Sequence, residues 1–184
     1  MFGDPFKPKK GIELKTFKDI CNVHQGLQIP ISKRLTKKED NCYTYITIQF
    51  LNGKKEIEYI KNPNPTVVCC KDDILMTRTG NTGQIITDVE GVFHNNFFII
   101  DYDKNKYNRL FLLTLLKRED VRAELINRAT TSTIPDLSHD KFYSCPVMMP
   151  LIEEQNKFAD FVQQIDKSKY IILSYLIYPD GMTK

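Results

Sequence analysis

A glycine-containing loop carries the most concentrated hydrogen-bonding chemistry in the sequence. The segment Thr77–Gly83 (TRTGNTG) combines a guanidinium, hydroxyls and an amide with two glycines. It lacks the lysine and the spacing of a phosphate-binding P-loop. Such a loop can still bring backbone N–H groups close to a phosphate while Arg78 or Asn81 reaches a base edge. The candidate nucleic-acid-binding residues are therefore Arg78, Thr79, Asn81 and Thr82; the alternative is a structural turn with Arg78 in a surface ion pair.

A polar triplet, His94-Asn95-Asn96, interrupts the apolar stretch Val92–Ile100. Polar side chains at this point lower the strand propensity unless they are satisfied or functional. Asn95 or Asn96 could pair with the edge of an adenine, and either could equally satisfy a neighbouring loop. Asn95 is the member of the triplet that we take as a candidate DNA-binding residue.

Catalytic arrangements find little support in the sequence. The histidines are His24, His94 and His139, and no G-x-S-x-G motif presents a serine nucleophile. The acidic pairs Asp72-Asp73 and Asp101-x-Asp103 lie at the ends of apolar segments, as turn residues do, and lack the acidic-x-Lys spacing of nuclease sites. We therefore expect no catalytic residues and no cofactor.

The cysteines do not provide an obvious metal site. No CxxC spacing occurs, and a zinc site built from Cys21, Cys42 and a histidine would lack a tight ligand pair. We expect no metal and five reduced thiols, mostly buried.

Positive charge is concentrated in two stretches. Residues 1–40 contain nine Lys or Arg against five Asp or Glu, and residues 104–128 contain seven against three, in a chain of net charge +3. This distribution favours a polyanion-binding surface, although solvated surface is the alternative. An exposed basic loop at residues 32–40 adds Lys33, Arg34 and Lys37 to the candidate DNA-binding residues.

Length and composition indicate one globular domain with an appendage. The chain has 184 residues, 41% of them hydrophobic, which is enough for a core. No apolar run reaches the roughly 18–20 residues that span a bilayer. The first residues lack the apolar segment of a signal peptide. We expect a cytoplasmic location and no membrane association.

Strand patterns dominate the middle of the sequence. Tyr43–Phe50 alternates and is rich in β-branched and aromatic residues, Asn52-Gly53 predicts a hairpin turn, and Glu56–Ile60 alternates back. Further expected strands are Thr66–Cys70, Ile74–Thr77, Gln84–Val89, Val92–Ile100 and Phe142–Met149, with Leu14–Val23 as a strand or helix after a ten-residue tether.

Helical periodicity appears later in the chain. Asn108–Lys117, with Asn108 as N-cap, and Glu119–Arg128 are predicted amphipathic helices, followed by a polar loop at Ala129–Thr133. From about Ile152 a long helix is expected. Its apolar positions form a heptad seam with a flaw at Lys169; they are Phe158, Val162, Ile165, Ile172 and Leu176. The seam predicts an interface; the alternative is a helix folded back on the core.

Four short motifs follow one another in a recognisable order. They are MFGDP at Met1–Pro5, DILMTRTGNTG at Asp73–Gly83, TTSTIPDLS at Thr130–Ser138 and PLIEEQ at Pro150–Gln155. In order and spacing they resemble the DNA-specificity subunits of Type I restriction-modification enzymes. The resemblance covers nearly the whole chain.

The resemblance implies an α+β fold. A β-rich target-recognition domain with short helices would occupy residues 1–150, and a long, coiled-coil-like C-terminal spacer helix with its tail would occupy residues 151–184. In the family, each recognition domain reads one half of a split DNA target in the major groove, and methyltransferase subunits dock beside the spacer helices. Catalysis, the methyl donor and the nuclease ATP belong to other subunits. The implied partners are double-stranded DNA, the methyltransferase (modification) subunits and, through them, the restriction subunit.

The chain also departs from the family pattern. Family members usually carry two recognition domains and two long helices, and here Tyr170–Pro179 replaces a charged coiled-coil continuation. We expect a half-subunit, a truncated product or an excised domain, and two copies could pair through the C-terminal helix as a homodimer. The alternative function is a non-catalytic protein-interaction module without a DNA role.

Overall fold

The protein is a mixed α/β domain followed by a long helix. The computed structural model describes residues 3–7, 10, 12–129 and 135–177, with side chains of the last helix described to Ser168. The strands are β1 (Glu13–Thr16), β2 (Cys21–Gln25), β3 (Cys42–Ile46), β4 (Tyr59–Lys61), β5 (Val68–Cys69), β6 (Ile74–Thr77), β7 (Ile85–Ile86), β8 (Gly91–Phe93), β9 (Phe97–Tyr102) and β10 (Pro146–Met149). The helices are α1 (Phe17–Ile20), α2 (Ile48–Leu51), α3 (Arg109–Leu116), α4 (Glu119–Arg128), α5 (His139–Tyr143) and α6 (Ile152–Ile177), with single 3-10 turns η1 (Ile31–Lys33) and η2 (Pro65–Val67).

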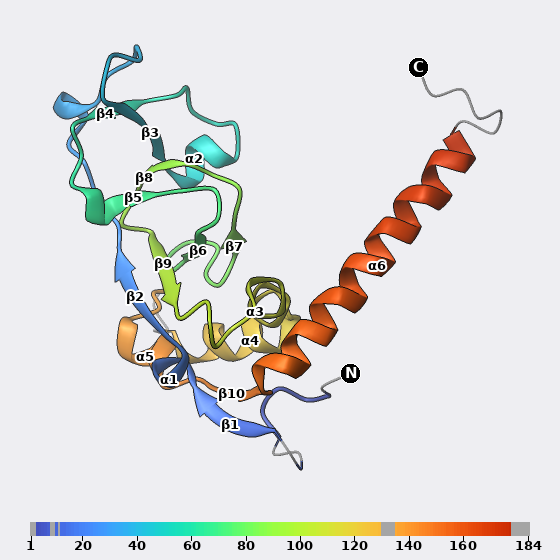
Figure 1. Ribbon diagram of the computed structural model, residues 1–184. Coiled ribbons are helices and arrows are strands. Elements are labelled where there is room, and N and C mark those ends of the chain that lie inside the picture. Colours follow the sequence, from blue (N-terminus) through green and yellow to red (C-terminus); the bar gives the residue numbers. More distant parts are fainter. Residues whose placement is uncertain (1–2, 8–9, 11, 130–134, 178–184) are drawn as a thin grey trace.

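Within the described residues the strands form three sheets. Strands β1 and β10 make a two-stranded ribbon, and the two larger sheets have the orders β2-β9-β6-β7 and β4-β3-β8-β5. Strands β3 and β8 are parallel, whereas the other neighbours are antiparallel. Figure 1 shows the sheet that contains β3 at one end of the domain and the helices α3, α4 and α5 at the other, with the sheet that contains β9 between them.

The two inner strands of the middle sheet, β6 and β9, are buried on both faces over most of their length. Ile74 and Met76 of β6 belong to the core beneath the helices, whereas Leu75 between them belongs to the core of the β3 sheet. Phe98 and Phe97 of β9 divide between the two cores in the same way. Strands with two buried faces are continuously apolar rather than alternating, which explains the pattern of these segments.

The two short helices were predicted correctly, including their order and their cap. The side chain of Asn108 accepts hydrogen bonds from the backbone of Leu110 and Phe111, so it is the N-cap of α3. Helix α4 spans Glu119–Arg128, as the pattern predicted. Most of the predicted loop that follows, residues 130–133, lies outside the described residues.

Helix α6 is attached to the domain by its first two turns. The side chain of Gln155 is buried, accepts from Asn108 N at 2.9 Å and donates to Pro150 O at 2.8 Å. The rings of Phe158 and Phe111 meet edge to face with centroids 5.6 Å apart. Beyond these contacts α6 projects away from the sheets (Figure 1). The division into two domains at residue 150 stays a prediction.

The predicted hairpin around Asn52-Gly53 is wrong. The expected strand Tyr43–Phe50 ends at Ile46, because the side chain of Thr47 accepts a hydrogen bond from Phe50 N and starts α2. Asn52 and Gly53, which has a φ of 66°, end that helix. Strand β3 therefore pairs with β4 across a helix and a longer connection.

Two other predicted strands are each two elements. Val92–Ile100 divides into β8 and β9, which lie in different sheets, and His94-Asn95-Asn96 forms the corner between them. Phe142–Met149 is the end of α5 followed by β10, because Ser138 caps a helix at this point.

The remaining patterns were partly correct. Leu14–Val23 contains strand, helix and strand. Ile74–Thr77 is a strand with the predicted bounds, whereas the strands expected at Glu56–Ile60, Thr66–Cys70 and Gln84–Val89 are shorter than expected. Pro5, expected in a tether, is buried, and its carbonyl accepts from Met148 N at 2.7 Å. Four of the five cysteine thiols are buried and Cys70 is exposed, as the sequence predicted for most of them. Among the described helices, none combines the length and apolarity needed to cross a membrane.

We predict that no side chain can be accommodated at Gly26, where the end of β2 lies against the backbone of Phe93 and His94. A Cβ at this position would lie 2.1 Å from Phe93 O and 2.6 Å from His94 O, both of which are backbone atoms. Gly26→Ala should destabilise the fold by about 3 kcal/mol or more in urea unfolding. The control Gly53→Ala, with open space around its Cβ and a φ of 66°, should cost about 1 kcal/mol. Equal stability of the two variants would contradict the prediction.

Candidate nucleic-acid interface

The glycine loop is the turn between β6 and β7. Gly83 N donates to Thr77 O at 2.8 Å, and Gln84 N donates to Thr77 Oγ1 at 2.9 Å. Gly80 and Gly83 have φ values of 81° and 80°, which side chains other than glycine rarely adopt. The two glycines are therefore required by the shape of the turn.

Arg78 is an internal clamp on this loop. Its Nη2 donates to both carboxylate oxygens of Asp136, at 2.6 and 2.7 Å. Its guanidinium lies 5.6 Å from the centre of the Phe98 ring, and its side chain is only 16% exposed. The ion pair that the sequence left open as the alternative for Arg78 is present. Direct contact between Arg78 and DNA stays a prediction.

Further contacts hold the loop against residues 135–137. Leu137 N donates to Arg78 O at 3.0 Å, and the buried Thr82 hydroxyl donates to Pro135 O at 2.9 Å. The Thr79 hydroxyl is also buried, and it has no hydrogen-bond partner in the described part of the chain. The hydroxyls that were predicted to bind DNA therefore lie on the protein side of the loop.

Arg122 of α4 is a functional candidate that the sequence did not single out. Its Nη2 donates to Asn81 Oδ1 at 2.5 Å, and its Nε donates to Thr82 O at 3.3 Å. Asn81 is exposed and also donates to Gln84 Oε1 at 2.8 Å. The only signal in the sequence was the basic stretch that contains Arg122, because nothing there indicates that α4 meets this loop.

Most of the other basic side chains in residues 104–128 form ion pairs or hydrogen bonds within the protein. Carboxylates or backbone carbonyls of the protein hold four of its basic residues, which are Lys106, Arg109, Arg118 and Arg128. The stretch therefore offers less free positive charge to a polyanion than its composition suggested.

Arg34 forms a second clamp in the basic loop. Its Nη1 donates to Glu58 Oε2 at 3.0 Å, and its Nε and Nη2 donate to Ile29 O at 2.9 and 2.6 Å. The guanidinium lies 5.0 Å from the centre of the Tyr45 ring, and the side chain is 13% exposed. Burial raises the pKa of Glu58, but hydrogen bonds from Lys55 and Arg34 outweigh it, so this pKa lies below its ordinary value.

The corner His94–Asn96 contributes backbone groups to both neighbouring sheets. His94 N donates to Ile46 O at 3.0 Å, and Gln25 Nε2 donates to Asn95 O at 2.8 Å. The side-chain Oδ1 of Asn95 is buried and has no hydrogen-bond partner among the described residues. The backbone carbonyl of Asn95 thus accepts a hydrogen bond from Gln25, whereas its side-chain oxygen accepts none among the described residues.

His94 is held in its neutral form at pH 7. Burial and the nearby charge of Arg34 lower the pKa of His94, against the opposing effect of a hydrogen bond with Asn96. Separately, its Nδ1 accepts a hydrogen bond from the backbone N–H of Asn96 at 3.1 Å, which favours the neutral ring. His94 therefore adds no positive charge to the corner.

Hydrogen bonds connect the glycine loop to the corner, and the segment before the basic loop to the strand that enters the corner. Arg78 N donates to Asn96 O at 2.8 Å, and Leu27 N, five residues before the basic loop, donates to Phe93 O at 3.1 Å. We call residues 27–38, 94–96 and 78–83 together the loop strip. Lys33 and Lys37 are exposed within it. Arg78 and Asn95 therefore lie in directly bonded segments, and Lys33, Arg34 and Lys37 follow a segment that is bonded to the residue before the corner. Contact between these residues and DNA stays a prediction.

The predicted interface residues lie elsewhere, on α6. Phe158 packs on α3, Val162 is half-buried and Ile165 is 36% exposed. The side chains of Ile172 and Leu176 lie outside the described residues. Figure 1 shows α6 leading away from the loops.

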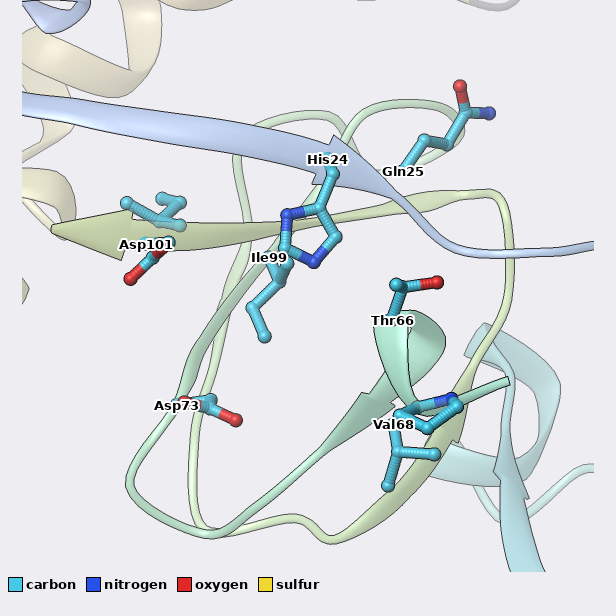
Figure 2. A pocket seen from close by; sticks show the side chains of 9 residues that line it. His24, Gln25, Thr66, Val68, Asp73, Ile99 and Asp101 are labelled. Atoms are coloured by element: carbon cyan, nitrogen blue, oxygen red, sulfur yellow. The ribbon is translucent and has the colours of Figure 1, made fainter. Parts of the chain in front are cut away.

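A separate cavity of about 510 Å³ opens beside β2 and β9. Figure 2 shows the His24 and Ile99 side chains pointing into it, across from Thr66 and Val68, with Asp73 and Asp101 also on its wall. Its carboxylates disfavour a phosphate group. No group of three possible metal ligands occurs within the described ranges.

The domain therefore combines three sheets, loops joined by hydrogen bonds and a projecting helix. Residues 9–174 match the family of the Type I restriction modification DNA specificity domain, and the chain belongs to this family. A comparison with curated proteins gave no match.

Solved structures support the same fold. The HsdS subunit from Thermoanaerobacter tengcongensis is similar with a TM-score of 0.65 and 16% identity, over 88% of this chain and 39% of that one. The S subunit of a Type I restriction-modification system from M. genitalium gives 0.61 and 13%, over 92% and 44%. A chain from a study of type I R-M complex assembly and conformational transition gives 0.69 and 15%, over 90% and 41%. The chain spans less than half of each of these chains, and at such identities the likeness concerns the fold.

The clamp between Arg34 and Glu58 should be measurable as a pH-dependent coupling. A double-mutant cycle with Arg34→Met and Glu58→Gln should give a coupling of about 1.5–3 kcal/mol at pH 7 by urea unfolding. Because the pKa of Glu58 is lowered in the folded state, the coupling is complete above about pH 5 and declines as the pH falls through that lowered pKa.

The exposed pair of Lys61 and Glu39 is the control for this cycle. Its side chains are 52% and 51% exposed, so the cycle Lys61→Met with Glu39→Gln should give less than about 1 kcal/mol. A coupling between Arg34 and Glu58 that is no larger than this control would show that Arg34 is not a clamp.

Proposed function

We propose that this chain recognises duplex DNA for a Type I restriction-modification system, reading one half of a split target without catalysing a reaction. The observation that carries the proposal is the loop strip, in which polar loops from three parts of a family member are joined by hydrogen bonds. Such a strip combines groups for phosphates with groups for base edges. The proposed location is the cytoplasm.

The residues of the strip divide by their contacts. Lys33 and Lys37 are exposed and would bind phosphates. Asn81 is exposed and, with Arg122 beside it, would face a base edge. Arg34, Arg78 and Thr82 would act on DNA mainly through the loops whose shape they hold. Thr79 Oγ1 and Asn95 Oδ1 are buried without a hydrogen-bond partner among the described residues, and their contact with DNA is part of the proposal.

Helix α6 would serve as the spacer and the docking element. Its apolar residues Phe161 and Ile165 are 49% and 36% exposed, and they follow the first two turns, which attach the helix to the domain. These residues suit a second helix, either from another copy of this chain or from a second recognition half, with methyltransferase subunits alongside. The same exposed residues favour the second candidate function, a protein-interaction module without a DNA role.

DNA binding by the isolated chain should be weak and strongly salt-dependent. Binding of random-sequence duplex should weaken steeply as salt rises, because counterions are released from neutralised phosphates. Lys33→Ala and Lys37→Ala should each reduce the slope of log affinity against log salt by about one. Lys157→Ala on α6, whose lysine pairs with Glu154, is the control and should leave the slope unchanged. Absence of binding at low salt, or binding independent of salt, would favour the interaction module.

We also predict that two copies of the chain associate through α6. Ile165→Asp places a charge among the exposed apolar residues, so it should weaken a homodimer by roughly tenfold or more in sedimentation or light scattering. Gln163→Asp adds the same charge on the opposite side of the helix and should have little effect. A monomeric wild type, or a dimer insensitive to Ile165→Asp, would remove α6 from the interface.

A further inference from the structure

Ile31 begins the 3-10 turn η1, which we call the tip of the segment 27–38, and its side chain lies outside both hydrophobic cores. It is 77% exposed, more than any other large apolar side chain in the described part of the protein. Single apolar side chains are common on protein surfaces, so exposure alone assigns no function. A role for Ile31 in binding must therefore be argued from the residues around it.

The backbone around Ile31 is fixed from several sides. The Tyr45 hydroxyl accepts from Ile29 N and donates to Leu27 O, both at 2.9 Å, and Arg34 donates twice to Ile29 O. Arg34 N donates to Ile31 O at 3.0 Å and closes the single turn of η1. Ile31 is thus presented at a defined position, and little conformational freedom remains to be lost on binding.

The charge around this tip favours a polyanion. Lys33, Lys37 and Lys38 are exposed and follow Ile31 within seven positions. The nearby carboxylate of Glu39 is already paired with Lys61, at 2.7 Å. The charge of Arg34, in turn, is compensated by Glu58. Asp40 is a further exposed carboxylate, but residues 31–40 still carry four basic against two acidic side chains, so the tip has a positive local field.

The shape of the tip favours a groove of DNA over an apolar protein surface. A protein partner would usually meet a larger contiguous apolar patch, whereas η1 presents one β-branched side chain flanked by lysines. In the major groove, the apolar feature among the base edges is the 5-methyl group of thymine. We propose that Ile31 contacts a thymine 5-methyl group and so determines one position of the target. This inference rests on the proposed function.

The test uses the full chain and a random-sequence duplex library. Each thymine of the selected site is then replaced by uracil, which removes only the methyl group. Binding is compared for the wild type, Ile31→Ala and Ile57→Ala. Ile57 is 46% exposed and lies directly between Glu56 and Glu58, so it controls for the same loss of atoms.

At one thymine, uracil should weaken binding of the wild type and of Ile57→Ala about fourfold, as expected for one buried methyl group. The same replacement should change binding of Ile31→Ala by less than about twofold. The inference is overturned if a site is selected but every replacement affects the wild type and Ile31→Ala equally. If the wild type selects no sequence at all, the proposed function fails and the inference with it.

Discussion

The structure depends on one corner of the backbone, His94–Asn96, where the chain leaves one sheet and joins the next. Polar backbone groups inside a protein must find partners, and here those partners come from distant segments. Ile46 O, the Gln25 side chain and Arg78 N provide them. Because each of these residues begins or borders a loop, the same hydrogen bonds that allow the corner also fix the loops relative to one another.

Two arginine clamps, Arg34 and Arg78, then hold the conformation of the basic loop and of the glycine loop. Each guanidinium pairs with a carboxylate, lies over an aromatic ring of the protein and is mostly buried. A buried ion pair adds little net stability, because the loss of hydration offsets the attraction, but breaking it is costly. The planar guanidinium also imposes direction, which a lysine would not. We infer that the clamps mainly hold the loops in one geometry, ready to bind.

Sequence patterns predicted the elements that neighbouring residues determine. They failed where contacts between residues far apart in the sequence determine the structure. The helix period and the Asn108 cap lie within α3, so that helix was predicted correctly. The stretch Val92–Ile100 is apolar on both sides of its corner because both sheets are buried, so no pattern marks the change of sheet. Likewise the glycine loop was found, but the partner of Arg78, Asp136, lies 58 residues away.

The clamps also change how the charge of the chain bears on binding. Arg34 and Arg78 count toward the net charge of +3, yet their charges are compensated at their own carboxylates. The cations left on the loop strip are chiefly lysines, which act on phosphates as hydrated point charges without directional pairing. If the proposed function holds, discrimination between sequences must then come from amides and apolar contacts on rigid loops. In this chain Arg34 and Arg78 hold the shape of their loops, and direct contact between either side chain and DNA stays a prediction.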